Sequence, residues 1–167
     1  MRHPLASKRK IFCLMRFIRW QIGQKLQPYP VVYNLVENSQ LVVERGMHGA
    51  TGNIYVGLLE FPEMSFVLHC LTDKDLFGDI GANVGAFSII ASVNAGANTI
   101  SVEPIPDTYK KMVRNVKINN AENKIKTLQV GVGDKNTILR FTENLDTING
   151  VALNQDNDVN TVEVQVL

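Results

Sequence analysis

Between residues 76 and 132 the hydrophobic pattern changes from strand to helix and back twice, and this alternation limits the possible folds more than any other feature. Short apolar runs predict three strands, at 76–80, 99–102 and 125–132. Segments with helical spacing lie between them, at 84–95 and 106–120. This order predicts a parallel sheet with right-handed crossovers and flanking helices. The fold class is therefore α/β, and these residues correspond to half of a doubly wound, Rossmann-like fold.

The segments outside this region predict further elements. An amphipathic helix is expected over residues 8–26, and another begins at Pro62 and closes at 72–75. Two short strands, at Val31–Val32 and Leu41–Val43, are expected in residues 31–57, with the rest a glycine-containing loop. A final strand pair is expected at 137–141 and 161–167, around an Asn-rich loop. We expect an extension, 1–49, followed by one domain, 50–167.

Charge and cysteine content narrow the classes of protein. Residues 1–50 hold eight Lys and Arg against two acidic residues, whereas the remainder is mildly acidic. Cys13 and Cys70 allow at most one disulfide and have no metal-ligand spacing. We therefore expect a reducing, cytoplasmic location, no metal site and no nucleic-acid partner.

The predicted helix over residues 8–26 is basic and has an apolar face. That face consists of Ile11, Leu14, Met15, Ile18, Ile22 and Leu26. Its apolar start is interrupted by Arg16 and Arg19, so it is too short for a signal-peptide core or a membrane span. Two interpretations remain open. The helix either contacts a membrane surface peripherally, where Phe17 and Trp20 would suit the headgroup layer, or packs on its own domain.

The turn after the first predicted strand has the pattern Gly-x-x-x-Gly, formed by Gly81 and Gly85. Such a turn lies at the carboxyl edge of the sheet, where folds of this class bind ligands. A dinucleotide fingerprint would need a middle glycine, and Asn83 occupies that position. A phosphate-binding P-loop would need a Lys followed by Ser or Thr, which is absent. The turn therefore suits neither a pyrophosphate nor a triphosphate.

Acidic residues at the predicted strand ends indicate a cationic ligand instead. Asp79 ends the first strand, where a carboxylate would repel phosphate but would suit the sulfonium and ammonium groups of S-adenosylmethionine. Glu103 ends the second strand and could accept hydrogen bonds from ribose hydroxyls. Asp134, just past the third strand, could accept from an adenine amino group, or could be a solvated surface carboxylate.

Three successive motifs resemble those of FkbM-type methyltransferases, which are S-adenosylmethionine-dependent O-methyltransferases. They are Asp79–Gly85, Val102–Pro106 and Asn115–Asn119, and the segment from Tyr55 to Phe61 resembles the lead into that domain. The resemblance covers about residues 50–135 well and continues more loosely to Leu167. It implies an S-adenosylmethionine methyltransferase fold that methylates a hydroxyl on a sugar or natural product, with a small-molecule or glycan acceptor.

The resemblance also implies the roles of individual residues. Gly81, Ala82 and Gly85 would form the cofactor loop, and Asp79 and Asn83 would help to hold the methionine end. By the same resemblance, Glu103 would contact the ribose and Pro104 would lie beside the adenine. No catalytic base can be assigned from the sequence. His48 lies in the expected loop, while His69 and Cys70 are expected to be buried structural residues in a helix.

Two departures from the family pattern affect the expected activity. Gly78 lies inside the first strand, where the family usually has a β-branched residue. The sequence also ends before a fourth strand, so we expect a fold incomplete at the C-terminus, with an open sheet edge available for self-association. A truncated, inactive enzyme is one expectation. A non-catalytic cofactor-binding or interaction module is the alternative, and the missing glycine disfavours a nucleotide-dependent oxidoreductase.

Overall fold

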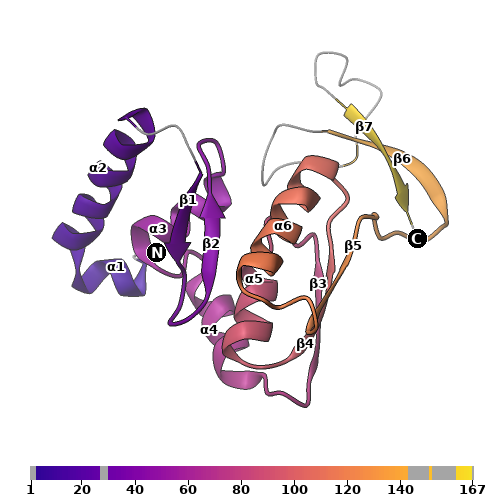
Figure 1. Cartoon of the computed structure of the whole chain (residues 1–167), viewed down its shortest axis with the longest axis horizontal. Coiled ribbons are helices and arrows are strands. Elements are labelled where there is room, and N and C mark those ends of the chain that lie inside the picture. Colours follow the sequence, from indigo (N-terminus) through magenta and orange to yellow (C-terminus); the bar gives the residue numbers. More distant parts are fainter. Residues whose placement is uncertain (1–2, 27–29, 143–150, 152–160, 167) are drawn as a thin grey trace.

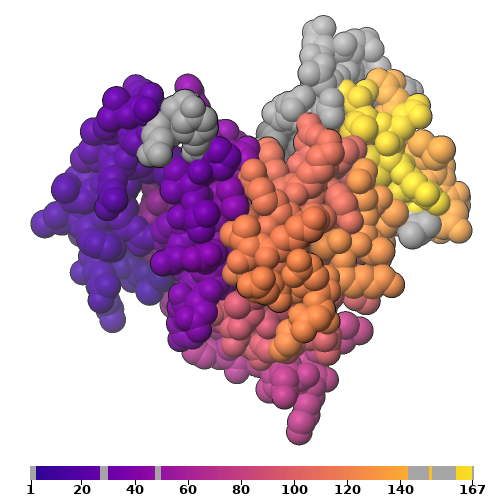
Figure 2. Space-filling model, viewed as in Figure 1, coloured from indigo at the N-terminus to yellow at the C-terminus, as the bar shows by residue number. Residues whose placement is uncertain are grey.

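The computed structural model describes residues 3–26, 30–142, 151 and 161–166 (Figure 1). The elements up to Cys70 are two helices, a hairpin and two further helices. In chain order these are α1 (Pro4–Lys8), α2 (Lys10–Leu26), β1 (Val31–Asn34), β2 (Gln40–Val43), α3 (His48–Val56) and α4 (Phe61–Cys70). Strands β1 and β2 are antiparallel. Figure 2 shows α1 and α2, in indigo, along one flank of the molecule.

The predicted parallel sheet is confirmed. Its strands are β3 (Leu76–Ile80), β4 (Asn98–Val102) and β5 (Ile125–Leu128), in the order β3-β4-β5. The connections are α5 (Ala86–Ile89), which continues as the π-helical turn η1 (Ile90–Asn94), and α6 (Pro106–Ile118). The predicted last pair is also present, as antiparallel β6 (Thr137–Thr142) and β7 (Thr161–Val166).

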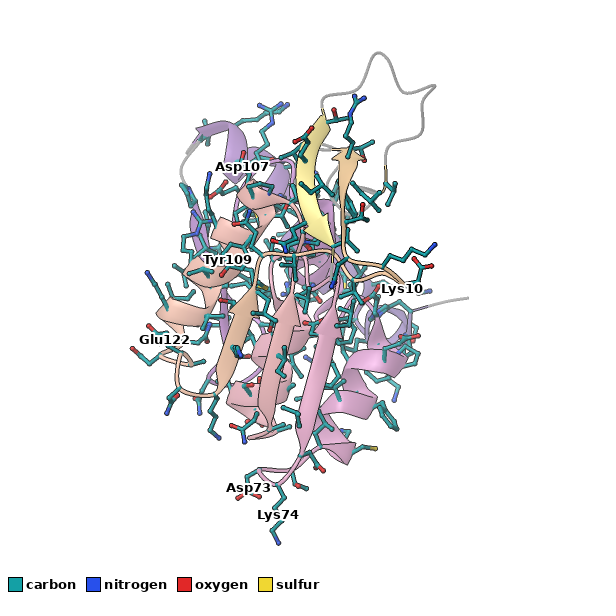
Figure 3. All side chains as sticks on the ribbon, turned by 90° about the vertical axis from the view of Figure 1, so that its right-hand side faces the viewer. Lys10, Asp73, Lys74, Asp107, Tyr109 and Glu122 are labelled. Atoms are coloured by element: carbon teal, nitrogen blue, oxygen red, sulfur yellow. The ribbon has the colours of Figure 1, made fainter. Side chains whose placement is uncertain are left out.

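Helices cover one face of the parallel sheet. Figures 1 and 3 show α4, α5 and α6 on the same side, with no described helix on the other. On the covered side Thr99 and Ser101 of β4 are fully buried, and both hydrogen-bond to serines of α5 and η1. On β3, by contrast, Leu76 is 68% exposed and Ile80 is 62% exposed. Strand β3 pairs only with β4 among the described strands, so it is an edge strand, and it carries apolar side chains in solvent.

An apolar core joins the N-terminal elements to the sheet. It takes Leu41 and Val43 from β2, Met64 and Val67 from α4, Ile89 and Ile90 from the α5–η1 segment, and Val116 and Ile125 from α6 and β5. The predicted division between residues 49 and 50 falls inside α3, and side chains from both sides of it enter this core. Burial of these side chains is the main favourable term in joining the two parts.

The expected loop up to residue 57 is wrong over its second half, because residues 48–56 form α3. Two glycines in the segment disfavour a helix by propensity. Ala50 and Ile54, however, lie one turn apart and are both buried in the core. Gly52 lies against Leu59, since a Cβ atom on it would lie 2.6 Å from the end of that side chain, which would have to shift. Tertiary packing therefore outweighs the local preference.

Four smaller expectations are also corrected. His69 and Cys70 are exposed rather than buried, because they lie at the end of α4 on the side away from the core. The N-terminal helix begins at Pro4 and is broken at Arg9, whose φ of −136° is not helical. The third strand stops at Leu128, and the first crossover helix starts at Ala86 after a tight turn. Cys13 and Cys70 are both free thiols.

Most of the Asn-rich loop expected between the last two strands lies outside the described residues.

Candidate cofactor-binding site

The turn between β3 and α5 is built from left-handed residues. Gly81, Asn83 and Gly85 have φ values of 77°, 51° and 85°. Asparagine is one of the few residues with a side chain that adopts this conformation readily. Asn83 therefore has a left-handed conformation at the position where a dinucleotide fingerprint has its middle glycine. At Gly85 there is a second constraint, since an added Cβ would lie 3.1 Å from Cγ of Met112.

The N–H groups of this turn are largely used within the protein. Those of Gly81 and Ala82 both donate to the carbonyl oxygen of Val102, each at 2.9 Å. The N–H of Asn83 donates to Oε2 of Glu103, also at 2.9 Å. A phosphate-binding turn needs free N–H groups directed at the ligand. The structure therefore supports the inference that the turn does not serve a phosphate.

Glu103 braces the turn from behind. Its side chain is only 5% exposed, and its second oxygen, Oε1, accepts from the N–H of Ile105 at 2.9 Å. Burial raises the pKa of this carboxyl, an effect that the two backbone hydrogen bonds oppose and the nearby Asp79 reinforces. Each carboxylate oxygen has a second acceptor site. A ribose contact at Glu103 therefore stays a prediction. Glu103 also positions the turn through its two backbone hydrogen bonds, a role that the sequence did not reveal.

Asp79 lies at the end of β3, within a short polar chain. It accepts a hydrogen bond from the Ser88 hydroxyl, which lies 2.7 Å from the hydroxyl of Ser101. Burial raises the pKa of Asp79, although the hydrogen bonds from Ser88 counteract this. A partly desolvated carboxylate of this kind gains most from a cationic partner. The site thus holds a charge that no described cation neutralises through a salt bridge.

A cavity of about 460 Å³ lies in front of the turn. It is lined by Asn53, Leu59, Glu60, Met64, Asp79, Gly81, Ala82, Asn83, Val84, Ala86 and Phe87. Among these lining residues two are acidic, Glu60 and Asp79, and none is Lys, Arg or His. Its volume is in the range of cavities that hold small molecules and cofactors. Its charge suits a cationic ligand with an apolar part, which fits S-adenosylmethionine and not a phosphate ester.

The structure brings most of the predicted site residues together. Asp79, Gly81, Ala82 and Asn83 line the cavity, and Gly85 precedes the first residue of α5. Glu103 and the half-buried Pro104 lie behind the turn and do not line the cavity. Asp134 is exposed in the segment between β5 and β6 and does not line it either. An adenine contact at Asp134 stays a prediction.

The opposite wall of the cavity was missed at the sequence level. It comes from Asn53 of α3, from Leu59 and Glu60, and from Met64 of α4. Glu60 lies in the segment that resembles the lead into the family's domain, which was the available signal. Asn53 gave none, because its segment was expected to be a loop. It is 1% exposed, and its Oδ1 accepts from the N–H of Leu59 at 2.9 Å, so it shapes the connection that carries Glu60.

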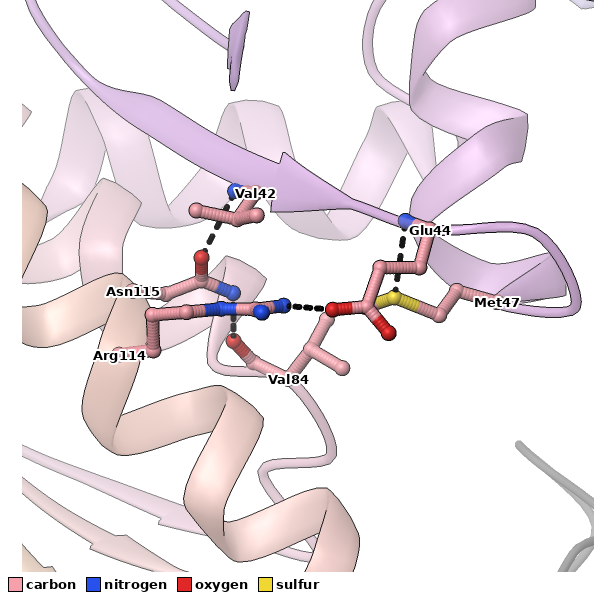
Figure 4. A network of polar contacts seen from close by, with 6 residues as sticks. All are labelled: Val42, Glu44, Met47, Val84, Arg114 and Asn115. Carbon is pink, nitrogen blue, oxygen red and sulfur yellow. Dashed lines mark hydrogen bonds and ion pairs between the residues drawn. The ribbon is translucent and has the colours of Figure 1, made fainter. Parts of the chain in front are cut away.

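The third motif, Asn115–Asn119, has a structural role that Figure 4 shows in part. Asn115 is fully buried; its Oδ1 accepts from the N–H of Val42 and its Nδ2 donates to the carbonyl of Val84, both at 2.8 Å. Asn119 makes the same kind of pair with the N–H and carbonyl of Gln40. Arg114 adds an ion pair with Glu44 at 2.6 Å. The motif thus fastens β2 to α6 and to the cavity turn.

Comparison with known proteins agrees with this geometry. Residues 79–167, which include the turn, Glu103 and the asparagine motif, match the methyltransferase FkbM domain. The chain belongs to the FkbM methyltransferase family. No curated protein matches this FkbM-family chain.

Two solved structures show the same fold at low identity. A Pyrococcus horikoshii protein named as a transferase superimposes with a TM-score of 0.53 at 14% identity, covering 71% of this chain and 48% of its own. TYW2 of the same organism, in complex with MeSAdo, gives 0.52 at 18% identity, covering 77% and 50%. The FkbM-family chain therefore spans about half the length of these structures. They confirm a methyltransferase-type α/β fold.

Proposed function

We propose that this chain binds S-adenosylmethionine in the cavity between the 81–85 turn and helices α3 and α4, as part of a methyltransferase. The observation that carries the proposal is the charge of the cavity. Asp79 and Glu60 line it without a basic residue, while the turn's N–H groups are engaged elsewhere. A sulfonium and an ammonium group would meet complementary charge there, whereas a pyrophosphate would meet repulsion.

The chain's own residues would hold and orient the cofactor. Asp79 would pair with the cationic methionine end, and the backbone at Gly81 and Ala82 permits close approach. Glu103 would keep Asn83 in its left-handed conformation through the hydrogen bond to its N–H. When bound, the cofactor supplies an electrophilic methyl group on sulfur. Proximity and orientation contribute much of the rate in such transfers, so a rigid turn is the protein's main contribution at this end.

The acceptor is proposed to be a hydroxyl group on a sugar or another small molecule, by resemblance to the family. Transfer to a hydroxyl forms an O–CH₃ bond, breaks the S–CH₃ bond and releases the hydroxyl proton to a base. The described lining residues include two carboxylates, Glu60 and Asp79, and no histidine. We do not assign Asp79 as the base, because it is proposed to face the cofactor's positive charge.

Calorimetry with the purified chain tests the cofactor proposal. S-adenosylmethionine and S-adenosylhomocysteine should both bind, with the methylated, positively charged form favoured, and NAD should not. Absence of binding by both sulfur compounds, or tighter binding of NAD, would overturn the proposal. Asp79→Asn should weaken this binding, and Asp107→Asn is its matched control, because Asp107 is exposed and forms an ion pair with Lys110 on the surface.

A second candidate function is a cofactor-binding module without catalysis. The observation that favours it is the edge position of β3, which pairs only with β4 among the described strands and so could receive a strand of a partner. Transfer of a labelled methyl group from S-adenosylmethionine to a panel of sugar and small-molecule hydroxyls separates the two candidates. Binding without transfer to any acceptor supports the module, and transfer supports the enzyme.

A further inference from the structure

Helix α2 contacts its own domain through the face opposite to its apolar stripe. The inward side chains are Cys13, Arg16, Trp20, Gln21 and Gln24, all half-buried. Arg16 donates a hydrogen bond to the Tyr33 hydroxyl, and Gln21 donates to the Tyr55 hydroxyl at 3.2 Å. The contact is thus polar and aromatic. Trp20 belongs to it, so it does not contribute to an outward membrane-facing surface.

The apolar stripe faces solvent instead. Its members and their exposed fractions are Ile11 80%, Leu14 56%, Met15 61%, Ile18 41%, Ile22 53% and Leu26 80%. No residue of α2 is buried. Figure 2 shows the outer side of the helix uncovered along the flank of the molecule. The stripe runs from Ile11 to Leu26, or about 22 Å at 1.5 Å per residue. The helix thus packs on its own domain, as one of the two interpretations expected, but it does so through its polar face and leaves the apolar stripe in solvent.

The charges around this stripe are of one sign. Lys8, Arg9, Lys10, Arg19 and Lys25 are all exposed on or beside α2. The first acidic residue in the sequence is Glu37, so no carboxylate within α1 or α2 offsets them. A helix with a continuous apolar face and a basic remainder is typical of segments that lie in the plane of an anionic membrane surface.

We infer that α2 is a docking helix for an anionic lipid surface, with its apolar stripe at the boundary of headgroups and acyl chains. A second copy of the chain is a poorer occupant, because stripe-to-stripe pairing would bring two sets of lysines and arginines together without acidic partners. Docking would be peripheral. In the part of the chain that the structure describes, no helix has the length and apolar content to cross a bilayer. The inference is independent of the proposed function.

Vesicle flotation of the full chain tests this inference. Vesicles of phosphatidylcholine with about 30% phosphatidylserine should bind the chain at least about tenfold more strongly than phosphatidylcholine alone. The triple variant Leu14→Ser, Ile18→Ser, Ile22→Ser should reduce binding to the anionic vesicles by at least about tenfold. Its matched control is Val132→Ser, Ile138→Ser, Phe66→Ser, at apolar side chains that are 60–65% exposed elsewhere. The control should bind like the unmodified chain.

A charge variant and a folding measurement complete the test. Lys10→Glu with Lys25→Glu should abolish the preference for phosphatidylserine, whereas Lys110→Glu with Lys126→Glu, exposed on α6 and β5, should preserve it. Circular dichroism should be unchanged in all variants, because every altered side chain is exposed. Equal binding to both vesicle types, or binding unaffected by the stripe variant, would overturn the inference. A dimer in sedimentation that the stripe variant dissociates, without vesicle binding, would overturn it in favour of a second copy.

Discussion

Asp79 combines a half-buried position with a charge that has no described salt-bridge partner, and the proposed ligand is what would neutralise it. We expect Asp79→Asn to weaken S-adenosylmethionine binding by about 1.5–3 kcal/mol, the range for a hydrogen bond to a charged group. Its carboxamide oxygen can still accept from the Ser88 hydroxyl, so the melting temperature should stay equal or rise. Calorimetry and thermal unfolding of the same preparation measure both effects. A lower melting temperature with unchanged affinity would contradict the assignment.

The raised pKa values of Asp79 and Glu103 give stability a specific pH dependence. Such a carboxyl binds its proton more tightly in the folded state than in the unfolded state, where its pKa is about 4. The free energy of unfolding therefore falls as the pH rises from about 4 through the pKa of the folded state. Acidification from neutral pH towards that value should therefore stabilise the ligand-free chain. Below it, Asp75 and Asp107, with lowered pKa values, lose their stabilising contribution.

Melting curves of the unmodified chain and of Asp79→Asn across this range test the dependence. The variant should show a smaller rise in melting temperature on acidification, because one of the two carboxyls with a raised pKa is gone. Parallel curves would show that Asp79 does not titrate differently in the folded state. In the presence of S-adenosylmethionine the rise should shrink as well, since a bound cation favours the ionised carboxylate.

The sequence predicted where the acidic residues lie but not all that they do. Asp79 and Glu103 follow apolar runs, and parallel strands bring such ends to one edge, so their proximity was predictable. The two hydrogen bonds that the Glu103 oxygens accept from backbone N–H groups were not predictable. Those N–H groups point towards Glu103 only after the turn folds over β4. The predicted adenine contact at Asp134 rested only on its place after the third strand. That strand stops earlier than the apolar pattern suggested.

At the scale of elements, the turn into α5 depends on Gly85. An alanine there would adopt a left-handed conformation that costs roughly 1–2 kcal/mol. Its Cβ would also press on Met112, 3.1 Å away. We expect Gly85→Ala to destabilise the chain by about 2 kcal/mol in denaturant unfolding and to weaken cofactor binding. Gly78→Ala is the matched control: its Cβ meets nothing within 4 Å, and it should stabilise β3 by about 0.5–1 kcal/mol. Similar losses in both variants would refute this account.

The connection between β2 and α6 depends on Asn115. Asn115→Leu keeps the side chain's approximate volume but leaves the N–H of Val42 and the carbonyl of Val84 without their partner. Since each unsatisfied buried group costs about 1–3 kcal/mol, we expect a loss of about 3–4 kcal/mol. Asn119→Leu should cost less, because Asn119 is half-buried and water can replace it. Urea unfolding of both variants measures the difference, and an equal cost would contradict the ranking.

Elements with a regular period were predictable, whereas those set by tertiary contacts were not. The three parallel strands and α6 follow directly from their hydrophobic spacing. Helix α3 was missed because its glycines suggest a loop until the Leu59 side chain that packs on Gly52 is known. For α2 the helix was predicted, but the direction of its apolar stripe was not. Periodicity identifies an apolar face without indicating what it contacts.

For the whole molecule, the outer side of β3 is the surface at which we expect self-association. An open groove of about 700 Å³ runs beside it, lined in part by Phe66, Phe77 and Ile80. Free strand edges with apolar neighbours template further pairing. We expect concentration-dependent self-association in sedimentation velocity, reduced by Ile80→Lys and unchanged by Ile138→Lys, whose side chain is equally exposed on β6. An unmodified chain that stays monomeric at high concentration would refute this expectation.

The attachment of β2 has a consequence for the order of events during synthesis. The N–H of Val42 finds its acceptor on Asn115, 73 residues further along the chain. As the nascent chain emerges from the ribosome, the hairpin is therefore exposed well before the side chain that completes its edge exists. Contacts of such long sequence separation form late and slowly. The hairpin should thus remain a client for chaperones until α6 has been translated. The exposed edge of β2 is covered only when the asparagine motif becomes available.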